Sequence, residues 1–424
     1  MVIKTEGQTD EPSPQENTET KQTSEGDNEE GVGEKKEGVE EEDDEEEEEE
    51  EEEGPQDSFI GVPQAGAGKW ASCIRIIEPS QLESTFLLEL PEHEAAFSLC
   101  ILPFASRPDV TFLAVGTVSN LIYSPQKFSA AFIHIYQFVR EGAGLQLLHK
   151  TPVDEVPLAL SAYQGKLLAG VGKALRVYDL GKRKLLKKTE TRTFPTSIRS
   201  INISHDRIFV GDMAEAFHVV KYKKEAKQLV KYAESSAPLY LTSCCVLDYN
   251  TVAAADKFGN LLLTRVPAHL NNVHLEDPSG GILRGKYGEL LHDDLPKLQN
   301  EVHYHVGEMI TSIQKAALVP GPEVLIYTTI LGAIGIFIPF LSREKLDFFS
   351  HLEMHLRGSN APLAGRDHMA YRSAYWPVKS VTDGDLCEQF ASLDFESQNT
   401  IAEELVCKVA DVNKELEAMR NRVL

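Results

Sequence analysis

Short apolar runs recur through the middle of the chain, and each is followed by a turn of glycine or polar residues and then by a second apolar run. Runs of this length, closed by such turns, predict pairs of antiparallel β-strands. The runs are TFLAVGTVSNL (111–121), KLLAGVGKALRVYDL (166–180), RIFVGDMAEAFHVVKY (207–222), TVAAADKFGNLLLTRV (251–266) and VLIYTTILGAIGIFIP (324–339).

The spacing of these runs indicates a repeat. Equivalent positions are Gly116, Gly170, Gly211, Ala255 and Thr329, which lie 54, 41, 44 and 74 residues apart. A polar insertion at about residues 267–300 accounts for the long last step. A period of about 40–45 residues with several strands per unit is typical of a β-propeller, because one four-stranded blade cannot cover both of its own faces. With further strands between Trp70 and Phe104, we expect six or seven blades, although the WD and GH dipeptides of regular WD40 repeats are absent from the sequence.

After Phe340 the apolar spacing changes from two to three and four. The segment Glu344–Arg357 has the pattern of an amphipathic helix. A loop, a strand over Ala374–Val381 and a helix opening at Asp383 are expected to follow. The sequence therefore predicts a mainly β fold, with a β-propeller over residues 58–342 and a mostly helical C-terminal domain over residues 343–424.

The last predicted helix carries an apolar stripe whose members are three or four residues apart, which places them on one face. We expect this face to pack within the fold, because an exposed apolar stripe of this length favours aggregation. Thr400 and Glu403 have the spacing of a capping box, and a start at Ser397 is equally open. The stripe consists of Ile401, Leu405, Val409, Val412, Leu416, Met419 and Val423.

Charge divides the chain into two parts. Residues 1–57 contain 26 acidic and 4 basic residues and no aromatic residue, whereas residues 58–424 contain 40 acidic and 38 basic residues. Like charges at this density, with nothing apolar to bury, predict a disordered acidic leader. Such a leader is a solubilising linker or a docking tail for a basic partner, and composition favours the linker.

Several classes of protein receive no support. The N-terminus lacks the apolar segment of a secretory signal. The six cysteines (Cys73, Cys100, Cys244, Cys245, Cys387 and Cys407) form no CxxC pair and fit a reducing compartment. The uncharged stretch Val324–Leu341 is long enough to consider as a membrane span, but its threonines, glycines and proline favour two short strands joined by a turn.

Motifs for catalysis or metal binding are weak. Gly66-Ala67-Gly68-Lys69 fails as a phosphate loop, because Pro63 and Trp70 stand where a glycine and a serine or threonine are needed. The pairs His303/His305 and His351/His355 lack further ligands at metal-site spacing, so structural roles are favoured. Asp383 and Asp385 stand at a turn-to-helix boundary, where an acid caps the helix. We expect no catalytic, cofactor-binding or metal-binding residues.

Two basic clusters lie beside predicted strand ends. The candidate phosphate contacts are Lys182, Arg183, Lys184, Lys187 and Lys188. The second cluster consists of Lys221, Lys223, Lys224 and Lys227. Lysines that protect solvated blade edges are an equally good explanation. The near-neutral body argues against a dedicated nucleic-acid binder.

Several segments together carry a family resemblance. The body resembles the C-terminal region shared by the large subunit of the cleavage and polyadenylation specificity factor, the damaged-DNA-binding adaptor of cullin ligases and a splicing-factor subunit, and it looks closest to the third subunit of splicing factor 3b. The segments are GKWASCIRIIEP (68–79), HKTPVDEVPLAL (149–160), QGKLLAGVGKALRVYDLGKRKLLKK (164–188), VLDYNTVAAADKFGNL (246–261), YHVGEMITSIQKAALVPG (304–321), DFFSHLEMHLRG (347–358) and GRDHMAYRSAYWPVKSVTDGDLCEQF (365–390).

The resemblance implies a seven-bladed propeller and a helical C-terminal domain that act as a nuclear scaffold without cofactors, a small-molecule substrate or a membrane. It implies contacts with the helical-repeat subunit and a small accessory subunit of splicing factor 3b, within the U2 snRNP, and mostly indirect contact with pre-mRNA. Two upstream propellers of the family lie outside this sequence, so any cleft that they form needs another chain. The alternatives are an adaptor in DNA repair, ubiquitin ligation or 3′-end processing, and a direct nucleic-acid binder.

Overall fold

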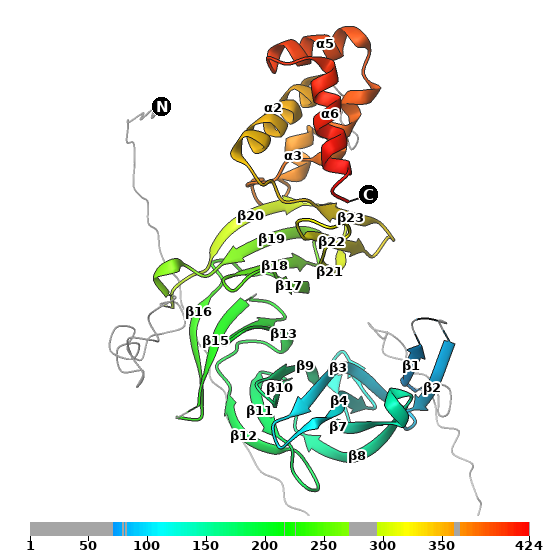
Figure 1. Cartoon of the computed structure of the whole chain (residues 1–424). Coiled ribbons are helices and arrows are strands. Elements are labelled where there is room, and N and C mark those ends of the chain that lie inside the picture. Colours follow the sequence, from blue (N-terminus) through cyan, green and yellow to red (C-terminus); the bar gives the residue numbers. More distant parts are fainter. Residues whose placement is uncertain are drawn as a thin grey trace, which may run out of the picture. The chain divides into compact units, whose positions relative to one another are not determined.

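The recurring apolar runs form successive antiparallel sheets of adjacent strands in a computed structural model (Figure 1). The structure describes residues 71–423 except residues 79, 81–82, 216, 225, 271–294 and 360–364. The predicted disorder of residues 1–57 therefore lies outside the described residues.

Four of the described sheets have four strands and a fifth has three. The first contains β3 (Glu94–Phe104), β4 (Arg107–Ser119), β7 (Ala130–Val139) and β8 (Gly144–Val153). The second contains β9 (Pro157–Tyr163), β10 (Lys166–Val171), β11 (Ala174–Asp179) and β12 (Leu186–Thr191). The third contains β13 (Ile198–Ser204), β14 (Arg207–Asp212), β15 (Phe217–Lys223) and β16 (Gln228–Glu234).

The fourth sheet contains β17 (Leu241–Val246), β18 (Thr251–Asp256), β19 (Asn260–Arg265) and β20 (Gln299–His305). The fifth contains β21 (Ile310–Ala316), β22 (Val324–Thr329) and β23 (Ile334–Phe337). Two-stranded sheets are formed by β1 (Cys73–Glu78) with β2 (Glu83–Glu89), and by β5 (Ile122–Tyr123) with β6 (Gln126–Lys127).

The repeat positions identified in the sequence all fall in the second strand of a sheet, where the first strand of the next sheet comes close. A Cβ atom at Gly170 would lie 2.6 Å from Ile198 at the start of β13. One at Gly211 would lie 2.7 Å from Leu241 at the start of β17. Small residues recur at this spacing because stacked sheets leave no room for a side chain there.

Apolar side chains fill the space between consecutive sheets. Phe104, Ile133 and Leu167 belong to the cluster between the first and second sheets, and matching clusters lie between the other neighbouring sheets. The mainly β, propeller-type fold with C-terminal helices is thus confirmed, while the expectation of about seven blades stays a prediction.

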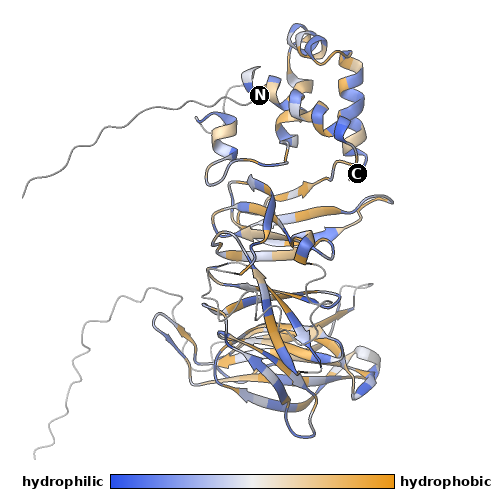
Figure 2. Ribbon diagram, turned by 90° about the vertical axis from the view of Figure 1, so that its left-hand side faces the viewer, coloured by the Kyte–Doolittle hydropathy of each residue, from blue (hydrophilic) through white to orange (hydrophobic). Residues whose placement is uncertain are grey.

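The C-terminal region is helical, as expected. The described helices are α2 (Arg343–Ser359), α3 (His368–Arg372), α4 (Gly384–Glu388), α5 (Phe395–Glu404) and α6 (Val409–Arg420). Each of the longer ones carries hydrophobic and hydrophilic residues (Figure 2). Leu352 of α2, Ile401 of α5 and Leu416 of α6 meet in one buried cluster. The apolar stripe of the tail therefore packs within the fold. The last described strand ends at Phe337 and α2 begins at Arg343, but the division of the chain at residues 57 and 342 stays a prediction.

Three details of this region were predicted wrongly. Residues 374–381 form no strand, only an isolated bridge between Lys379 and His303. The tail is not one helix, because Val406 has a φ of 56° between α5 and α6. The cap of α5 is neither Thr400 nor Ser397 but Asp394, whose carboxylate accepts from the Ser397 backbone N–H.

Residues 324–341 form β22 and β23 joined by a turn, which confirms the two-strand interpretation. Gly332 has a φ of 95° in this turn, a conformation that favours glycine. Among the helices that the structure describes, none is both long enough and apolar enough to cross a bilayer.

Candidate interaction sites

The first basic cluster lies on and beside the loop between β11 and β12. Lys182, Arg183 and Lys184 are exposed on this loop and form no ion pair with a residue that the structure describes. Lys187 and Lys188 lie on β12 and are paired, Lys187 Nζ with Glu190 at 2.8 Å and Lys188 Nζ with Asp179 at 3.6 Å. The five candidate phosphate contacts therefore separate into an unpaired loop and a paired strand.

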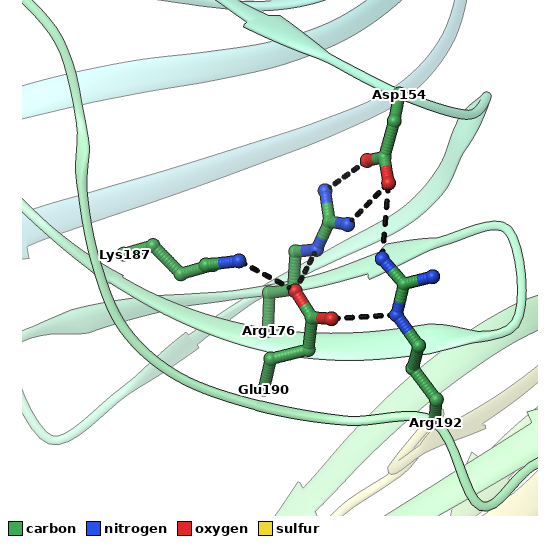
Figure 3. A network of polar contacts seen from close by, with 5 residues as sticks. All are labelled: Asp154, Arg176, Lys187, Glu190 and Arg192. Carbon is green, nitrogen blue, oxygen red and sulfur yellow. Dashed lines mark hydrogen bonds and ion pairs between the residues drawn. The ribbon is translucent and has the colours of Figure 1, made fainter.

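A network of five charged residues holds the base of this loop (Figure 3). Arg176 of β11 has a side chain only 6% exposed, and its Nε donates to Glu190 at 2.9 Å. Its Nη2 donates to Asp154, in the β8–β9 connection, at 2.8 Å. Arg192 bridges the same two carboxylates, at 2.6 Å to Glu190 and 3.1 Å to Asp154.

The network keeps both of its carboxylates ionised. The hydrogen bond from Lys187, against the effect of burial, lowers the pKa of Glu190 to about 2. The hydrogen bond from Arg176 likewise lowers the pKa of Asp154 to about 2. Because Arg176 lies on the third strand and Asp154 on the connection before the first strand, the network fixes the basic loop to the frame of the second sheet.

The second basic cluster lies at the β15–β16 connection of the neighbouring sheet. Lys221 Nζ is paired with Asp206 at 2.7 Å, whereas Lys224 and Lys227 are exposed. Both basic loops join the third strand of a sheet to the fourth, and β12 and β16 are in contact. Loops with this topology emerge on the same side of stacked sheets, so the two clusters share one side.

A buried ion pair joins the helical region to the fourth sheet. Arg372 of α3 donates from Nε to Asp383 at 2.7 Å. From Nη1 it donates to the backbone carbonyls of His305 and Val306 at 3.2 and 3.0 Å. Its guanidinium also lies 4.8 Å from the ring centroid of Tyr304. One arginine thus contacts a helix cap and the end of β20.

Asp383 is 2% exposed and is also the N-cap of α4, where it accepts from the backbone N–H groups of Asp385 and Leu386. This confirms the predicted capping role. Burial raises the pKa of Asp383, but the charge and hydrogen bond of Arg372 outweigh it and hold that pKa below its usual range. The carboxylate therefore depends on Arg372.

The histidines considered as metal ligands have structural surroundings. His305 Nδ1 lies 2.9 Å from Asn260 Oδ1, and His303 packs edge-on against Trp376. His355 Nδ1 lies 2.7 Å from Glu404, which joins α2 to α5. The described residues contain no group of three or more histidine, cysteine or acidic side chains that could hold a metal ion.

One buried polar group escaped the sequence analysis. Glu94 of β3 is 1% exposed and lies 2.9 Å from His134 Nε2 and 3.2 Å from Lys150 Nζ. Burial raises its pKa, but hydrogen bonds from His134 and Thr117 and the charge of Lys150 lower the pKa to about 2. No sequence signal marks this cluster, because its members lie on β3, β4, β7 and β8 and meet only in the folded sheet.

These features define a class of protein: stacked antiparallel sheets of propeller type, followed by packed helices, with charged groups that hold loops and elements together. The family follows from sequence comparison. Residues 71–392 match the CPSF A subunit region, and the chain belongs to that family.

The relatives are spliceosomal proteins by name. Spliceosome-associated protein 130 A of Arabidopsis thaliana is 48% identical over 371 residues, which is 87% of this chain and 30% of that protein. Splicing factor 3B subunit 3 of Danio rerio is 44% identical over 367 residues, 86% of this chain and 30% of that protein. Pre-mRNA-splicing factor RSE1 of Mycosarcoma maydis is 46% identical over 361 residues, 85% of this chain and 30% of that protein. The chain thus spans about 30% of the length of these curated relatives.

Proposed function

We propose that this chain is a non-catalytic scaffold subunit of the splicing factor 3b complex and that it acts in pre-mRNA splicing through contacts with other proteins. The observation that carries this proposal is the similarity of 44–48% identity, over 85–87% of the chain, to proteins named as splicing factors. The site of action is the nucleus, where splicing takes place.

The described polar groups support a scaffold. The ionised carboxylates of Glu94, Asp154 and Asp383 are each paired with a base inside the fold. Groups used in this way stabilise loops and elements and are not poised for proton transfer. The proposed partners are the helical-repeat subunit and the small accessory subunit of splicing factor 3b, with pre-mRNA contacted mostly indirectly.

Affinity purification of the tagged full chain from nuclear extract, followed by mass spectrometry, tests this proposal. We expect the other subunits of splicing factor 3b in stoichiometric amounts. Recovery of cullin-ligase subunits, or of the cleavage and polyadenylation machinery, would instead assign the chain to an adaptor role in ubiquitin ligation, DNA repair or 3′-end processing.

A second proposal concerns direct contact with RNA phosphates by the loop between β11 and β12, and the unpaired Lys182, Arg183 and Lys184 favour it. Replacement of these three residues by serine leaves the ion pairs of Lys187 and Lys188 in place. If the loop binds phosphate, the dependence of RNA affinity on salt becomes weaker by roughly one unit of slope for each phosphate that the variant no longer neutralises. An unchanged slope, which the scaffold proposal expects, removes the loop from the RNA interface.

A further inference from the structure

The last sheet has an open edge. Each of the four preceding main sheets has a fourth strand, whereas the described fifth sheet ends at β23, which pairs only with β22. The outer strand of the neighbouring fourth sheet is partly covered, because the backbone of Lys379 exchanges hydrogen bonds with that of His303 in β20. No described segment covers β23 in the same way.

The register of β23 shows which backbone groups face this edge. Thr329 donates its backbone N–H to the Ala333 carbonyl at 2.9 Å, and the pairing continues as Thr328 with Ile334 and Ile326 with Ile336. Antiparallel pairs alternate between hydrogen-bonded and non-hydrogen-bonded positions. The N–H and C=O groups of Ile334 and Ile336 therefore point away from β22, toward the open edge.

A cavity of about 740 Å³ lies along this edge. It is lined by β23, by Leu263 and Val302 of the fourth sheet, and by Leu416 and Met419 of α6. Side chains of the fourth sheet that a fourth strand would cover are thus only partly buried, as Leu263 and Val302 are. The cavity occupies the place that a fourth strand takes in the other sheets.

We propose that the edge of β23 binds an extended segment of another protein, which adds a fourth strand to the last sheet and places apolar side chains at alternate positions into the cavity. Unpaired backbone groups of an edge strand are satisfied by another strand, and the pocket beside them supplies side-chain specificity. The four residues of β23 span about 13 Å, so the segment needs four to six residues.

The shape of the cavity favours a slender segment over a second copy of this chain. The residues Ser380–Thr382 and the end of α6 also line it, so β23 lies inside a walled groove. A second copy would have to bring the same walls along with its own β23. This interaction surface does not depend on which complex contains the chain.

The test uses the full chain and a six-residue peptide, Lys-Val-Thr-Val-Thr-Lys, acetylated and amidated at its ends. Amide hydrogen exchange and NMR titration report on the edge. In the free chain, the amides of Ile334 and Ile336 should exchange faster than those of Gly335 and Phe337, and the peptide should protect them. Methylation of the backbone nitrogens of both central peptide residues should weaken binding at least about tenfold, because the complex then lacks about two hydrogen bonds.

The protein variants are matched at one position. Ile336→Pro removes an N–H that faces the open edge and spares the bonds to β22, so it should weaken peptide binding at least about tenfold, whereas Ile336→Thr keeps that N–H. Protection of Gly335 and Phe337 reports whether Ile336→Pro is folded, and Ile334→Pro replaces it if it is not. Failure to bind at millimolar peptide, or equal binding of the methylated peptide, overturns the proposal. So does slow exchange of Ile334 and Ile336 in the free chain, or a dimer that Ile336→Pro abolishes.

Discussion

Replacement of Arg372 by alanine should loosen the helical region from the fourth sheet. The substitution removes the donor of the 2.7 Å bond to Asp383 and the two bonds to the carbonyls of His305 and Val306. Asp383 stays buried, with only the cap bonds and His368 near its carboxylate. A charge that loses its partner in this setting is destabilising, because burial penalises the ionised form.

Removal of one partner of a buried pair costs about 3–5 kcal/mol, and we expect a loss of unfolding free energy in that range for Arg372→Ala. The matched control is Arg420→Ala. Arg420 Nε also donates to a carboxylate, Glu388, at 2.9 Å, but the two side chains are 48% and 38% exposed. Solvent screens such a pair, so this variant should be close to the wild type.

Urea unfolding monitored by tryptophan fluorescence measures the difference. The chain has two tryptophans, so a Trp70→Phe background leaves Trp376, which packs against His303 beside the junction, as the reporter. Arg372 holds the pKa of Asp383 below its unfolded value, so the stability from this pair is present near neutral pH and is lost as pH falls through the folded pKa.

In Arg372→Ala, burial should raise the pKa of Asp383 instead, so acid protonates the carboxylate and relieves the unpaired charge. The difference in stability between wild type and variant should therefore shrink between pH 7 and pH 4. An Arg372→Ala variant as stable as Arg420→Ala, or a difference that grows in acid, would refute the reasoning.

Three further predictions concern single positions. Glu94→Gln should flatten the fall of stability below about pH 4.5, because the carboxylate with a pKa of about 2 stabilises the fold above its unfolded pKa and this contribution is lost as pH falls toward 2; unfolding free energies over pH 3–6 that keep the wild-type slope would contradict this. Val406→Asn should raise the stability by up to about 1 kcal/mol in urea unfolding, because Val406 is 92% exposed at a φ of 56° and asparagine tolerates that conformation; a loss would argue against strain there. Leu416→Glu should lower the Tm by several degrees, because it buries a charge among α2, α5 and α6, whereas Leu331→Glu, at a residue 78% exposed, should not; equal Tm values for the two variants would place α6 outside the core.

The sheets could be predicted from the sequence because a physical constraint repeats along it. Each second strand must let the next sheet approach, so small residues such as Gly170 and Gly211 recur at nearly constant spacing. The helix α2 and the cap at Asp383 were also predictable, because their signals are local.

The errors arose where tertiary packing decides the local structure. Nothing in the sequence around Val406 is a helix breaker, and the chain turns there because α5 and α6 pack in the same core. Residues around Trp376 have the aromatic and β-branched content of a strand, but their side chains pack against β20 and only Lys379 pairs with it.

The candidate sites were predictable only in part. The exposed lysines of the β11–β12 loop are evident from the sequence, but the pairing of Lys187 with Glu190 depends on the strand register. The bonds of Arg372 reach carbonyls 66 and 67 residues earlier in the chain, a separation that no local pattern encodes.

The central claim is that the chain works within the splicing factor 3b complex of the U2 snRNP. Precipitation of the tagged full chain from nuclear extract at moderate salt, with the spliceosomal RNAs quantified in the precipitate, tests it most directly. The account predicts enrichment of U2 RNA over U1 RNA, retained when Lys182, Arg183 and Lys184 are replaced by serine. Recovery of the chain with no enrichment of U2 RNA would contradict it.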